Sequence, residues 1–373
     1  MEQVRTAVIG YGGMGRQYAQ MISQGKVPGM VLAGICCRNQ AGQEEIRTQY
    51  PQAKIYHNIK EVFAGKEELD AVLIVTPHST HVPIGKEAFS HGLSVLCDKP
   101  VGVDTREVKE LIRASEDAGK ALAVMFNVRT KPAYQKAREM MKDGSLGKIT
   151  RAVWVCNSWY RSPFYHRSSP WRSTWRGEQG GLLINQCQHF LDIWQWLFGM
   201  PQSLYASIDF GKYNDFTVDD SVDIQFFYEN GLRGTFISAS GEAPGVNRLE
   251  IWGSKGRLTI ENNEILTFDQ NEMSTEEFGA VNKEIFGAPG HHLEKIDLKP
   301  ETEAYETMLQ NFADHLLSGE PLIADGVDGL HAVELSNAAY LSAWTDKKIT
   351  LPADETLFEK LLTEHMENES IRS

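Results

Sequence analysis

Val4-Arg5-Thr6-Ala7-Val8-Ile9 runs directly into Gly10-Tyr11-Gly12-Gly13-Met14-Gly15 at the start of this 373-residue chain. The first six residues read as a short apolar strand, and the residues after Gly15 read as a helix. In a strand–turn–helix of this kind, Gly10 permits the tight turn, Gly12 lets the backbone approach a pyrophosphate, and Gly15 lets the helix pack on the strand. The N–H groups and the positive dipole end of the helix then face the phosphates. The stretch predicts a dinucleotide-binding site.

Strands and helices alternate through the first 125 residues. We expect strands at 4–9, 31–37, 71–75, 94–97 and 122–125, and helices at 16–24, 41–50, 82–91 and 105–118. The unbroken apolar run at 71–75 is typical of a parallel strand that is buried on both faces. The pattern predicts a doubly wound parallel sheet, whose ligands bind beyond the carboxyl ends of the strands. Four loops should meet there: 10–15, 37–39, 76–81 and 98–100.

The length of the chain predicts two domains. We assign 1–125 to a Rossmann dinucleotide-binding domain and 126–373 to an α/β domain that binds substrate and mediates oligomerisation. In the latter, strands are expected at 204–210, 221–227, 232–238, 247–252 and 256–261, and packing helices at 303–318 and 327–344. Polar and apolar residues alternate along 222–226, as in a half-buried antiparallel strand. The other face of this sheet would be covered in a homodimer or homotetramer, although a solvated face fits the same alternation. Residues after 364 are expected to fray.

Charge and cysteine content narrow the class of protein. The net charge of −13 and the absence of an arginine-rich stripe disfavour a nucleic-acid partner. No apolar run is long enough to span a bilayer, so no membrane partner is expected. The five cysteines are odd in number and lack CxxC spacing, which favours a reducing compartment over a disulfide framework. These features favour a cytoplasmic enzyme.

The end of the second strand bears on the choice of nicotinamide cofactor. NAD-binding sites usually place an acidic residue there to hold the ribose hydroxyls. This chain has Cys37-Arg38, and a guanidinium could bind a 2′-phosphate. The position favours NADP slightly, while NAD stays open because Arg38 could instead lie over the adenine or point to solvent.

Three further motifs carry a family resemblance. They are Thr76-Pro77-His78-Ser79-Thr80-His81, Val95-Leu96-Cys97-Asp98-Lys99-Pro100, and Gly180-Gly181-Leu182-Leu183-Ile184-Asn185-Gln186-Cys187-Gln188-His189-Phe190-Leu191-Asp192. In this order the chain resembles the Gfo/Idh/MocA oxidoreductases over essentially its whole length. The resemblance implies a Rossmann domain, an α/β domain with a large open antiparallel sheet, and hydride transfer between NAD(P) and a sugar or cyclitol carbon. It also implies that Lys99 contacts substrate and nicotinamide, and that His189 accepts the substrate proton.

The chain departs from the family pattern at two positions. The usual glutamate before the lysine is Asp98, a shorter carboxylate that could still reach the lysine or the cofactor. The first aspartate of the later motif is Asn185, and an amide can orient a hydroxyl but cannot accept its proton. A proton relay through position 185 is therefore excluded.

The residues support the same chemistry without the family. Oxidation of a secondary alcohol needs a base for the hydroxyl proton, and imidazole suits this task near neutral pH. If 182–198 is one helix, Asn185 and His189 lie on one face, and Asp192 could orient the imidazole. Asp192 could equally cap a helix or pair with Arg161 or Arg172. A metal site is not expected, since His78, His81 and the pair His291-His292 lack further ligands at suitable spacing.

Six of the eight tryptophans fall within 43 residues, with arginines interleaved. They are Trp154, Trp159, Trp171, Trp175, Trp194 and Trp196. We expect Trp194 and Trp196 to be core residues, and the turn-rich segment 159–176 to form a loop over the substrate crevice. Aromatic faces with fixed donors suit a sugar ring. Tyr160, Arg161, Trp171 and Arg172 are therefore predicted to contact substrate.

The sequence predicts an NAD(P)-dependent oxidoreductase acting on a secondary ring carbon, with carbon 3 one candidate, of a sugar, glycoside or cyclitol. The predicted cofactor-binding residues are Gly10, Tyr11, Gly12, Gly13, Met14, Gly15, Cys37, Arg38, Thr76, Pro77, His78, His81, Asp98, Lys99 and Asn127. The predicted substrate-binding residues are Lys99, Tyr160, Arg161, Trp171, Arg172, Asn185, His189 and Asp192, with Lys99 and His189 catalytic. The alternatives are an NAD-dependent glycosidase of the same fold, a non-catalytic nucleotide-sensing regulator and a zinc-dependent alcohol dehydrogenase.

Overall fold

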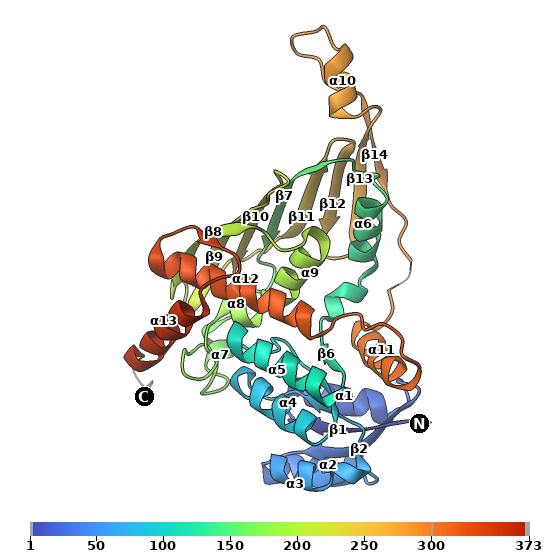
Figure 1. Cartoon of the computed structure of the whole chain (residues 1–373), viewed down its shortest axis with the longest axis vertical. Helices are drawn as coiled ribbons and strands as arrows, with labels where there is room; N and C mark the ends of the chain where they lie inside the picture. The colour runs from blue at the N-terminus through green and yellow to red at the C-terminus, as the bar shows by residue number, and fades with distance from the viewer. Residues whose placement is uncertain (1–2, 300, 370–373) are drawn as a thin grey trace. The chain divides into compact units, whose positions relative to one another are not determined.

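All pairings in the N-terminal sheet are parallel. The computed structural model describes residues 3–299 and 301–369. The strands lie in the order β3-β2-β1-β4-β5-β6, so strand order reverses between β1 and β4. Figure 1 labels β1, β2 and β6 of this sheet. The strands are β1 (Val4–Ile9), β2 (Met30–Cys36), β3 (Lys54–Tyr56), β4 (Ala71–Ile74), β5 (Ser94–Cys97) and β6 (Leu122–Val124). This is the predicted Rossmann arrangement, and the reversal marks where a dinucleotide would bind.

The helices of this unit follow the expected alternation. They are α1 (Gly13–Ser23), α2 (Gln40–Gln49), α3 (Ile59–Ala64), α4 (His81–Ser90) and α5 (Thr105–Ala118). The edge strand β3 and helix α3 were not expected. Asn39 and Asn58 cap α2 and α3 by accepting backbone N–H groups, and Asp104 caps α5.

A late segment of the chain belongs to the N-terminal unit. This unit comprises Met1–Asn127, Gly177–Gln179 and Thr302–Glu334. Met308 and Phe312, on helix α11 (Ala304–Ser318), lie in the same apolar core as β1 and β4. The predicted division at 125/126 therefore omits 302–334, whose apolar face covers a part of the core that the first 127 residues leave open.

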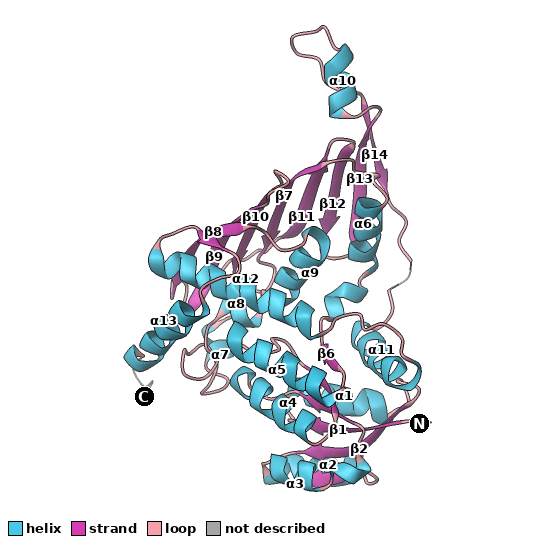
Figure 2. Ribbon diagram, in the orientation of Figure 1, coloured by secondary structure: helices cyan, strands magenta, loops and turns pink. Residues whose placement is uncertain are grey.

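The second unit is built on a nine-stranded mixed sheet (Figure 2). Its order is β14-β13-β12-β11-β7-β10-β9-β8-β15. The strands are β7 (Ile149–Cys156), β8 (Ser203–Phe210), β9 (Asp219–Phe227), β10 (Arg233–Ala239), β11 (Asn247–Gly253), β12 (Gly256–Glu261), β13 (Ile265–Asn271), β14 (His291–Lys295) and β15 (Ile349–Thr350). The sheet is antiparallel except where β7 pairs with β10 in parallel. The expected strands were found, but central β7, the strand β13 and the edge strands β14 and β15 were not anticipated.

Helices accompany this sheet and extend beyond it. They are α6 (Pro132–Lys142), α7 (Pro163–His166), α8 (Leu182–Asn185), α9 (Gln188–Phe198), α10 (Thr275–Val281) and α13 (Glu355–Asn368). Helix α12 (Gly326–Thr345) divides between the two units. Figure 2 shows α6 and α9 against one face of the sheet, and α6 contacts β12 and β13. Inward residues such as Ile224 and Phe226 are fully buried, whereas the alternating residues Asp223 and Gln225 are exposed.

The glycine at position 15 gives a stability prediction. A Cβ at Gly15 would lie 1.9 Å from the carbonyl oxygen of Gly10, whereas a Cβ at Gly13 would meet no atom within 4 Å. We expect Gly15→Ala to reduce the free energy of unfolding by about 1–3 kcal/mol, because backbone must move to admit the methyl group. Gly13→Ala, in the first turn of α1, should leave it unchanged or raise it slightly. Equal thermal midpoints for the two variants would contradict this reading.

Candidate functional site

The glycine loop presents open space on one side only. Gly10 has φ +106°, and a Cβ there would lie 2.5 Å from the carbonyl oxygen of Val75. A side chain at Gly12 or Gly13 would meet no atom within 4 Å, and Gly12 caps α1 without a side-chain hydrogen bond. Gly10 and Gly15 are thus required by packing, and Gly12 and Gly13 border free space at the N-terminus of α1. This is the cradle that a pyrophosphate requires, so the residues present fit a dinucleotide.

Tyr11 has a structural task within this loop. Its hydroxyl donates to Glu45 (3.1 Å), and the Arg16 guanidinium lies 4.6 Å from its ring centroid while binding the same carboxylate through two nitrogens. Burial raises the pKa of Tyr11. Because its side chain is occupied between α1 and α2, a cofactor contact from Tyr11 would have to come from its backbone.

The end of β2 leaves a single charge exposed. Cys37 is buried, donating its N–H to Tyr56 (2.9 Å) and accepting from the Gln43 amide (2.9 Å). Asn39 caps α2 by accepting the Gly42 N–H (2.6 Å). Arg38, between them, is exposed. Arg38 is therefore the side chain of this turn that remains available to a phosphate.

His81 joins the loops that follow β4 and β5. Its ring is buried, with Nε2 2.7 Å from the Thr76 carbonyl oxygen and Nδ1 2.7 Å from that of Pro100. A neutral imidazole can donate to only one of these oxygens, and burial lowers the pKa of His81 despite both contacts. His81 was predicted to touch the cofactor, but this geometry makes it a residue that positions the Thr76 and Lys99 loops.

Lys99 follows β5 directly. Its N–H donates to the Asp98 carboxylate (3.0 Å), and its bond to Pro100 is cis. Burial raises the pKa of Asp98, while the charges of Lys99 and His81 oppose that rise. His78 is also buried, 6.0 Å from His81 between ring centroids, and Asn127 hydrogen-bonds Tyr305 of α11.

The segment that carries His189 is two helices, not the single helix expected over 182–198. The Cys187 N–H bonds the Leu182 carbonyl (2.9 Å), five residues back, so the usual four-residue register is lost. The side chain of Gln188 then donates to the Leu183 carbonyl (3.1 Å). Asn185 ends α8, and His189 is the second residue of α9; both are partly exposed. The break between α8 and α9, rather than a shared helix face, therefore determines the relative positions of Asn185 and His189.

A buried carboxylate anchors the start of α8. Asp219 accepts the N–H groups of Gly181 and Leu183 (both 2.7 Å) and the hydroxyl of Tyr340 (2.5 Å). A Cβ at Gly180 would lie 2.4 Å from that hydroxyl, and one at Gly181 would lie 2.2 Å from the Asp219 carbonyl oxygen. The Gly-Gly pair is required because these groups pack so closely on the turn. Sequence reasoning did not identify Asp219.

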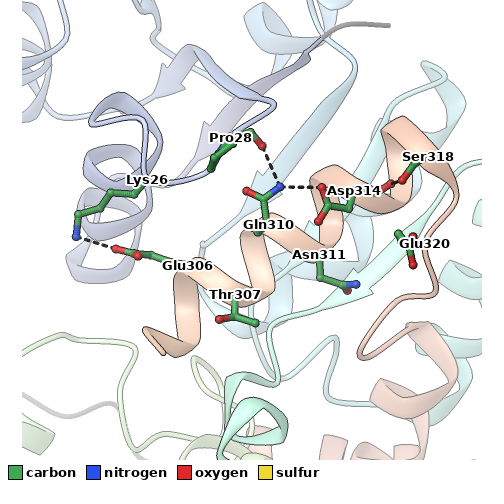
Figure 3. A pocket seen from close by; sticks show the side chains of 9 residues that line it. All are labelled: Lys26, Pro28, Glu306, Thr307, Gln310, Asn311, Asp314, Ser318 and Glu320. Atoms are coloured by element: carbon green, nitrogen blue, oxygen red, sulfur yellow. Dashed lines mark hydrogen bonds and ion pairs between the residues drawn. The ribbon is translucent and has the colours of Figure 1, made fainter. Parts of the chain in front are cut away.

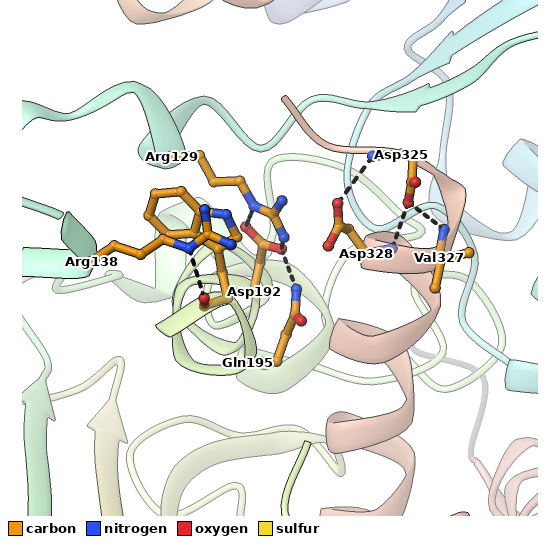
Figure 4. Close-up of polar contacts among 8 residues, drawn as sticks. Arg129, Arg138, Asp192, Gln195, Asp325, Val327 and Asp328 are labelled. Atoms are coloured by element: carbon orange, nitrogen blue, oxygen red, sulfur yellow. Dashed lines mark hydrogen bonds and ion pairs between the residues drawn. The ribbon is translucent and has the colours of Figure 1, made fainter. Parts of the chain in front are cut away.

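Asp192 pairs with a residue that the sequence analysis did not consider. The Arg129 guanidinium binds it through Nε (2.8 Å) and Nη2 (2.6 Å), and Gln195 donates to the same carboxylate (3.1 Å; Figure 4). Both charged side chains are essentially buried. The predicted partners Arg161 and Arg172 are therefore not those of this salt bridge, and stabilising the core is the role that the geometry gives Asp192.

Tyr165 is the ring on which Arg161 and Arg172 stack, and the sequence analysis did not predict a role for it. Arg172 donates to its hydroxyl through Nη1 (2.6 Å), and the Arg161 and Arg172 guanidiniums lie 4.9 and 4.4 Å from its ring centroid. The amides of Asn185 and Gln186 approach the same hydroxyl at 3.5 and 3.3 Å. Three predicted substrate residues, Arg161, Arg172 and Asn185, are thus brought together.

The remaining aromatic residues of this stretch take different places. Trp171 lies 4.8 Å from the Arg172 guanidinium, and Tyr160 is 52% exposed. Trp175 is buried, and its backbone N–H donates to the carboxylate of Glu369 (2.8 Å), the residue directly after α13. Helix α13 therefore continues to Asn368, against the expectation of fraying after 364; residues 370–373 lie outside the described part. Trp194 is buried as expected, whereas Trp196 is only partly buried beneath the Arg138 guanidinium (4.3 Å).

Other features of the described residues do not make a second site. A polar hollow of about 830 Å³ lies along α11, including Lys26, Glu306, Gln310 and Asp314 (Figure 3), at the C-terminal end of α1 and away from the glycine loop. His291 lies on edge strand β14, where its Nδ1 is 2.6 Å from the Asp269 carboxylate. Among described residues there is no cluster of three or more metal-ligating side chains, and no helix is long and apolar enough to cross a membrane.

The Arg129–Asp192 pair gives a second stability prediction. We expect Asp192→Asn to destabilise the protein by about 3–5 kcal/mol, since it removes the negative charge that Asp192 places against the buried Arg129 guanidinium. The double variant Arg129→Met/Asp192→Leu should recover most of that loss, and Glu110→Gln, at an exposed ion pair, should cost under about 1 kcal/mol. Thermal unfolding measures all three. A double variant no more stable than Asp192→Asn would contradict the assignment.

Comparison with known proteins agrees with the fold and the motifs. Residues 4–126 match the model of the oxidoreductase family with an NAD-binding Rossmann fold, and residues 134–259 match the GFO/IDH/MocA C-terminal domain. The inositol 2-dehydrogenase of Rhizobium meliloti is 25% identical, over 93% of this chain and 99% of its own length. The uncharacterized oxidoreductase YdgJ of Escherichia coli is 26% identical over 57% of its length.

Solved structures are similar throughout the chain. The WlbA dehydrogenase of Bordetella pertussis, in complex with NADH and UDP-GlcNAcA, has a TM-score of 0.79 at 22% identity, covering 94% of this chain and all of that one. Levoglucosan dehydrogenase, in complex with NADH and levoglucosan, has a TM-score of 0.78 at 18% identity with the same coverage. The chain belongs to the Gfo/Idh/MocA family of NAD-binding oxidoreductases.

Proposed function

We propose that this protein is an NAD(P)-dependent dehydrogenase that oxidises or reduces a secondary ring carbon of a sugar, glycoside or cyclitol. The observation that carries the proposal is the glycine loop, which is closed by packing at Gly10 and Gly15 and open at Gly12 and Gly13. The family membership and the inositol and sugar dehydrogenases among its relatives support the substrate class.

His189 and Lys99 carry the proposed chemistry. His189 accepts the proton of the substrate hydroxyl, and Asn185 orients that hydroxyl without accepting the proton. The positive charge of Lys99 lowers the hydroxyl pKa. When bound, the nicotinamide supplies the acceptor for the hydride that leaves the same carbon. Asp98 and His81 hold the loop on which Lys99 is mounted.

The oxidoreductase is tested by mixing the protein with NAD or NADP and a panel of cyclitols, aldoses and aryl glycosides. We expect the absorbance of reduced nicotinamide to rise in proportion to oxidised product, and to do so after exhaustive chelation. Release of aglycone without accumulation of reduced cofactor would instead establish the glycosidase. If neither signal appears although the cofactor binds, the regulator is favoured. Loss of activity on chelation would favour a metal-dependent enzyme.

Substitutions separate the proposed roles from folding. We expect His189→Ala and Lys99→Met to lower kcat by about a hundredfold or more, because general acid–base catalysis typically contributes that much, with the Kd for cofactor almost unchanged. His292→Ala, on the exposed edge strand, is the matched control and should keep full activity. A parallel loss of cofactor affinity and turnover in His189→Ala would undo its assignment.

Arg38 is the proposed determinant of cofactor phosphate preference. We expect Arg38→Gln to weaken NADP about tenfold through loss of a charged hydrogen bond, and to leave NAD unchanged. Arg47→Gln, exposed in the last turn of α2, serves as control. Fluorescence titration of both reduced cofactors measures this. Equal effects on the two cofactors, or none, would place Arg38 over the adenine or in solvent.

A further inference from the structure

Residues 159–176 are locally cationic in an acidic protein. The segment contains Arg161, Arg167, Arg172 and Arg176 and no aspartate or glutamate, whereas the whole chain has a net charge of −13. Arg176 is occupied by the carbonyls of Met366 (2.7 Å) and Glu367 (3.2 Å). Arg161 and Arg172 instead lie beside Tyr165, and we name Arg161, Tyr165 and Arg172 the arginine–tyrosine cluster.

Arg161 lacks the partner that comparable arginines of this chain have. Arg16, Arg129 and Arg248 each hold a carboxylate with the edge formed by Nε and Nη2. That edge is the usual one for two parallel bonds to an oxyanion. In Arg161 the contacts come from Nη1 alone, to the carbonyls of Trp159 (3.4 Å) and Tyr160 (3.2 Å). Among the described residues no carboxylate lies within ion-pair distance of Arg161, and its Nε is shielded from solvent without an acceptor.

The cluster is braced and adjoins the proposed substrate residues. The His166 Nδ1 lies 2.6 Å from the Ser173 hydroxyl, and Arg172 bonds Tyr165, so two contacts tie α7 to residues 172–173. The backbone N–H of Arg161 donates to the carbonyl of Ser240 (2.8 Å), the residue directly after β10. Tyr165 in turn contacts Asn185 and Gln186. A guanidinium stacked on a ring keeps its in-plane N–H donors for a ligand.

We propose that the arginine–tyrosine cluster binds an oxyanion of the substrate, so that the physiological substrate is an acidic sugar derivative bearing a carboxylate or a phosphate. The identification of the ligand as the substrate rests on the proposed function. The anion site itself is inferred from the geometry of Arg161 alone. The Nη2 of Arg161, which makes no hydrogen bond within the described residues, takes the oxyanion, and Arg172 adds charge and holds Tyr165 in place.

Calorimetric titration of the whole protein tests this without requiring turnover. The probes are methyl β-glucuronide, its neutral twin methyl β-glucoside, glucose 1-phosphate and inorganic phosphate. We expect the anionic sugars to bind about tenfold or more tightly than the glucoside, as one charged hydrogen bond would provide. The preference should weaken as salt is raised. The glucuronide and the phosphate ester, compared directly, identify which oxyanion fits.

Variants connect the preference to Arg161. Arg161→Gln should remove the preference for anions while leaving glucoside binding unchanged, and Arg161→Lys should restore part of it. Arg167→Gln, which removes the same charge from an exposed site in the same segment, should change each affinity by less than twofold. The thermal midpoint of each variant reports folding.

The outcomes separate this inference from the proposed function. Anion binding that depends on Arg161, with no hydride transfer to any sugar, would keep the anion site and overturn the dehydrogenase. Turnover of neutral sugars with no anion preference would keep the dehydrogenase and overturn the anion site. Failure of every anion to bind, or an Arg167→Gln effect as large as that of Arg161→Gln, would overturn the anion site.

Discussion

Helix α1 lies so close to β1 that a side chain at Gly15 would collide with the carbonyl oxygen of Gly10. This approach fixes the N-terminus of α1 at the point where the order of parallel strands reverses. Gly12 and Gly13 then border free space, and the helix dipole points toward it. The loops after β2, β4 and β5, which carry Arg38, Thr76 and Lys99, start from the same end of the parallel sheet as the glycine loop.

Buried polar groups do the corresponding work in the second unit. Asp219 holds the turn before α8 through two backbone N–H groups, and Asp192, on α9 itself, binds the buried Arg129 guanidinium. Neither group is exposed enough to react with substrate. These contacts fix both ends of the segment that carries Asn185 and His189, which suits the proton transfer that we propose for it.

Local signals in the sequence predicted much of the fold. β1, β5, β12 and α5 were predicted with the residues at which they begin and end, because apolar periodicity, caps and turns are encoded nearby. Long-range pairings were not predictable in this way. Arg129 and Asp192 lie 63 residues apart, Glu369 binds Trp175 from 194 residues away, and the return of 302–334 has no local signal. The break between α8 and α9 depends on a single slipped hydrogen bond, and Tyr165 was recognisable only once its neighbours were placed.

The central claim is that the open side of the glycine loop holds a nicotinamide dinucleotide. Native mass spectrometry of the wild-type protein and of Gly12→Val, after incubation with NAD and NADP, tests it most directly. We predict one dinucleotide per chain in the wild type, and a large loss of occupancy in Gly12→Val at an unchanged thermal midpoint, since a Cβ at Gly12 would meet no atom within 4 Å. A wild type that binds neither dinucleotide, or a Gly12→Val variant that binds as well as the wild type, would contradict the account.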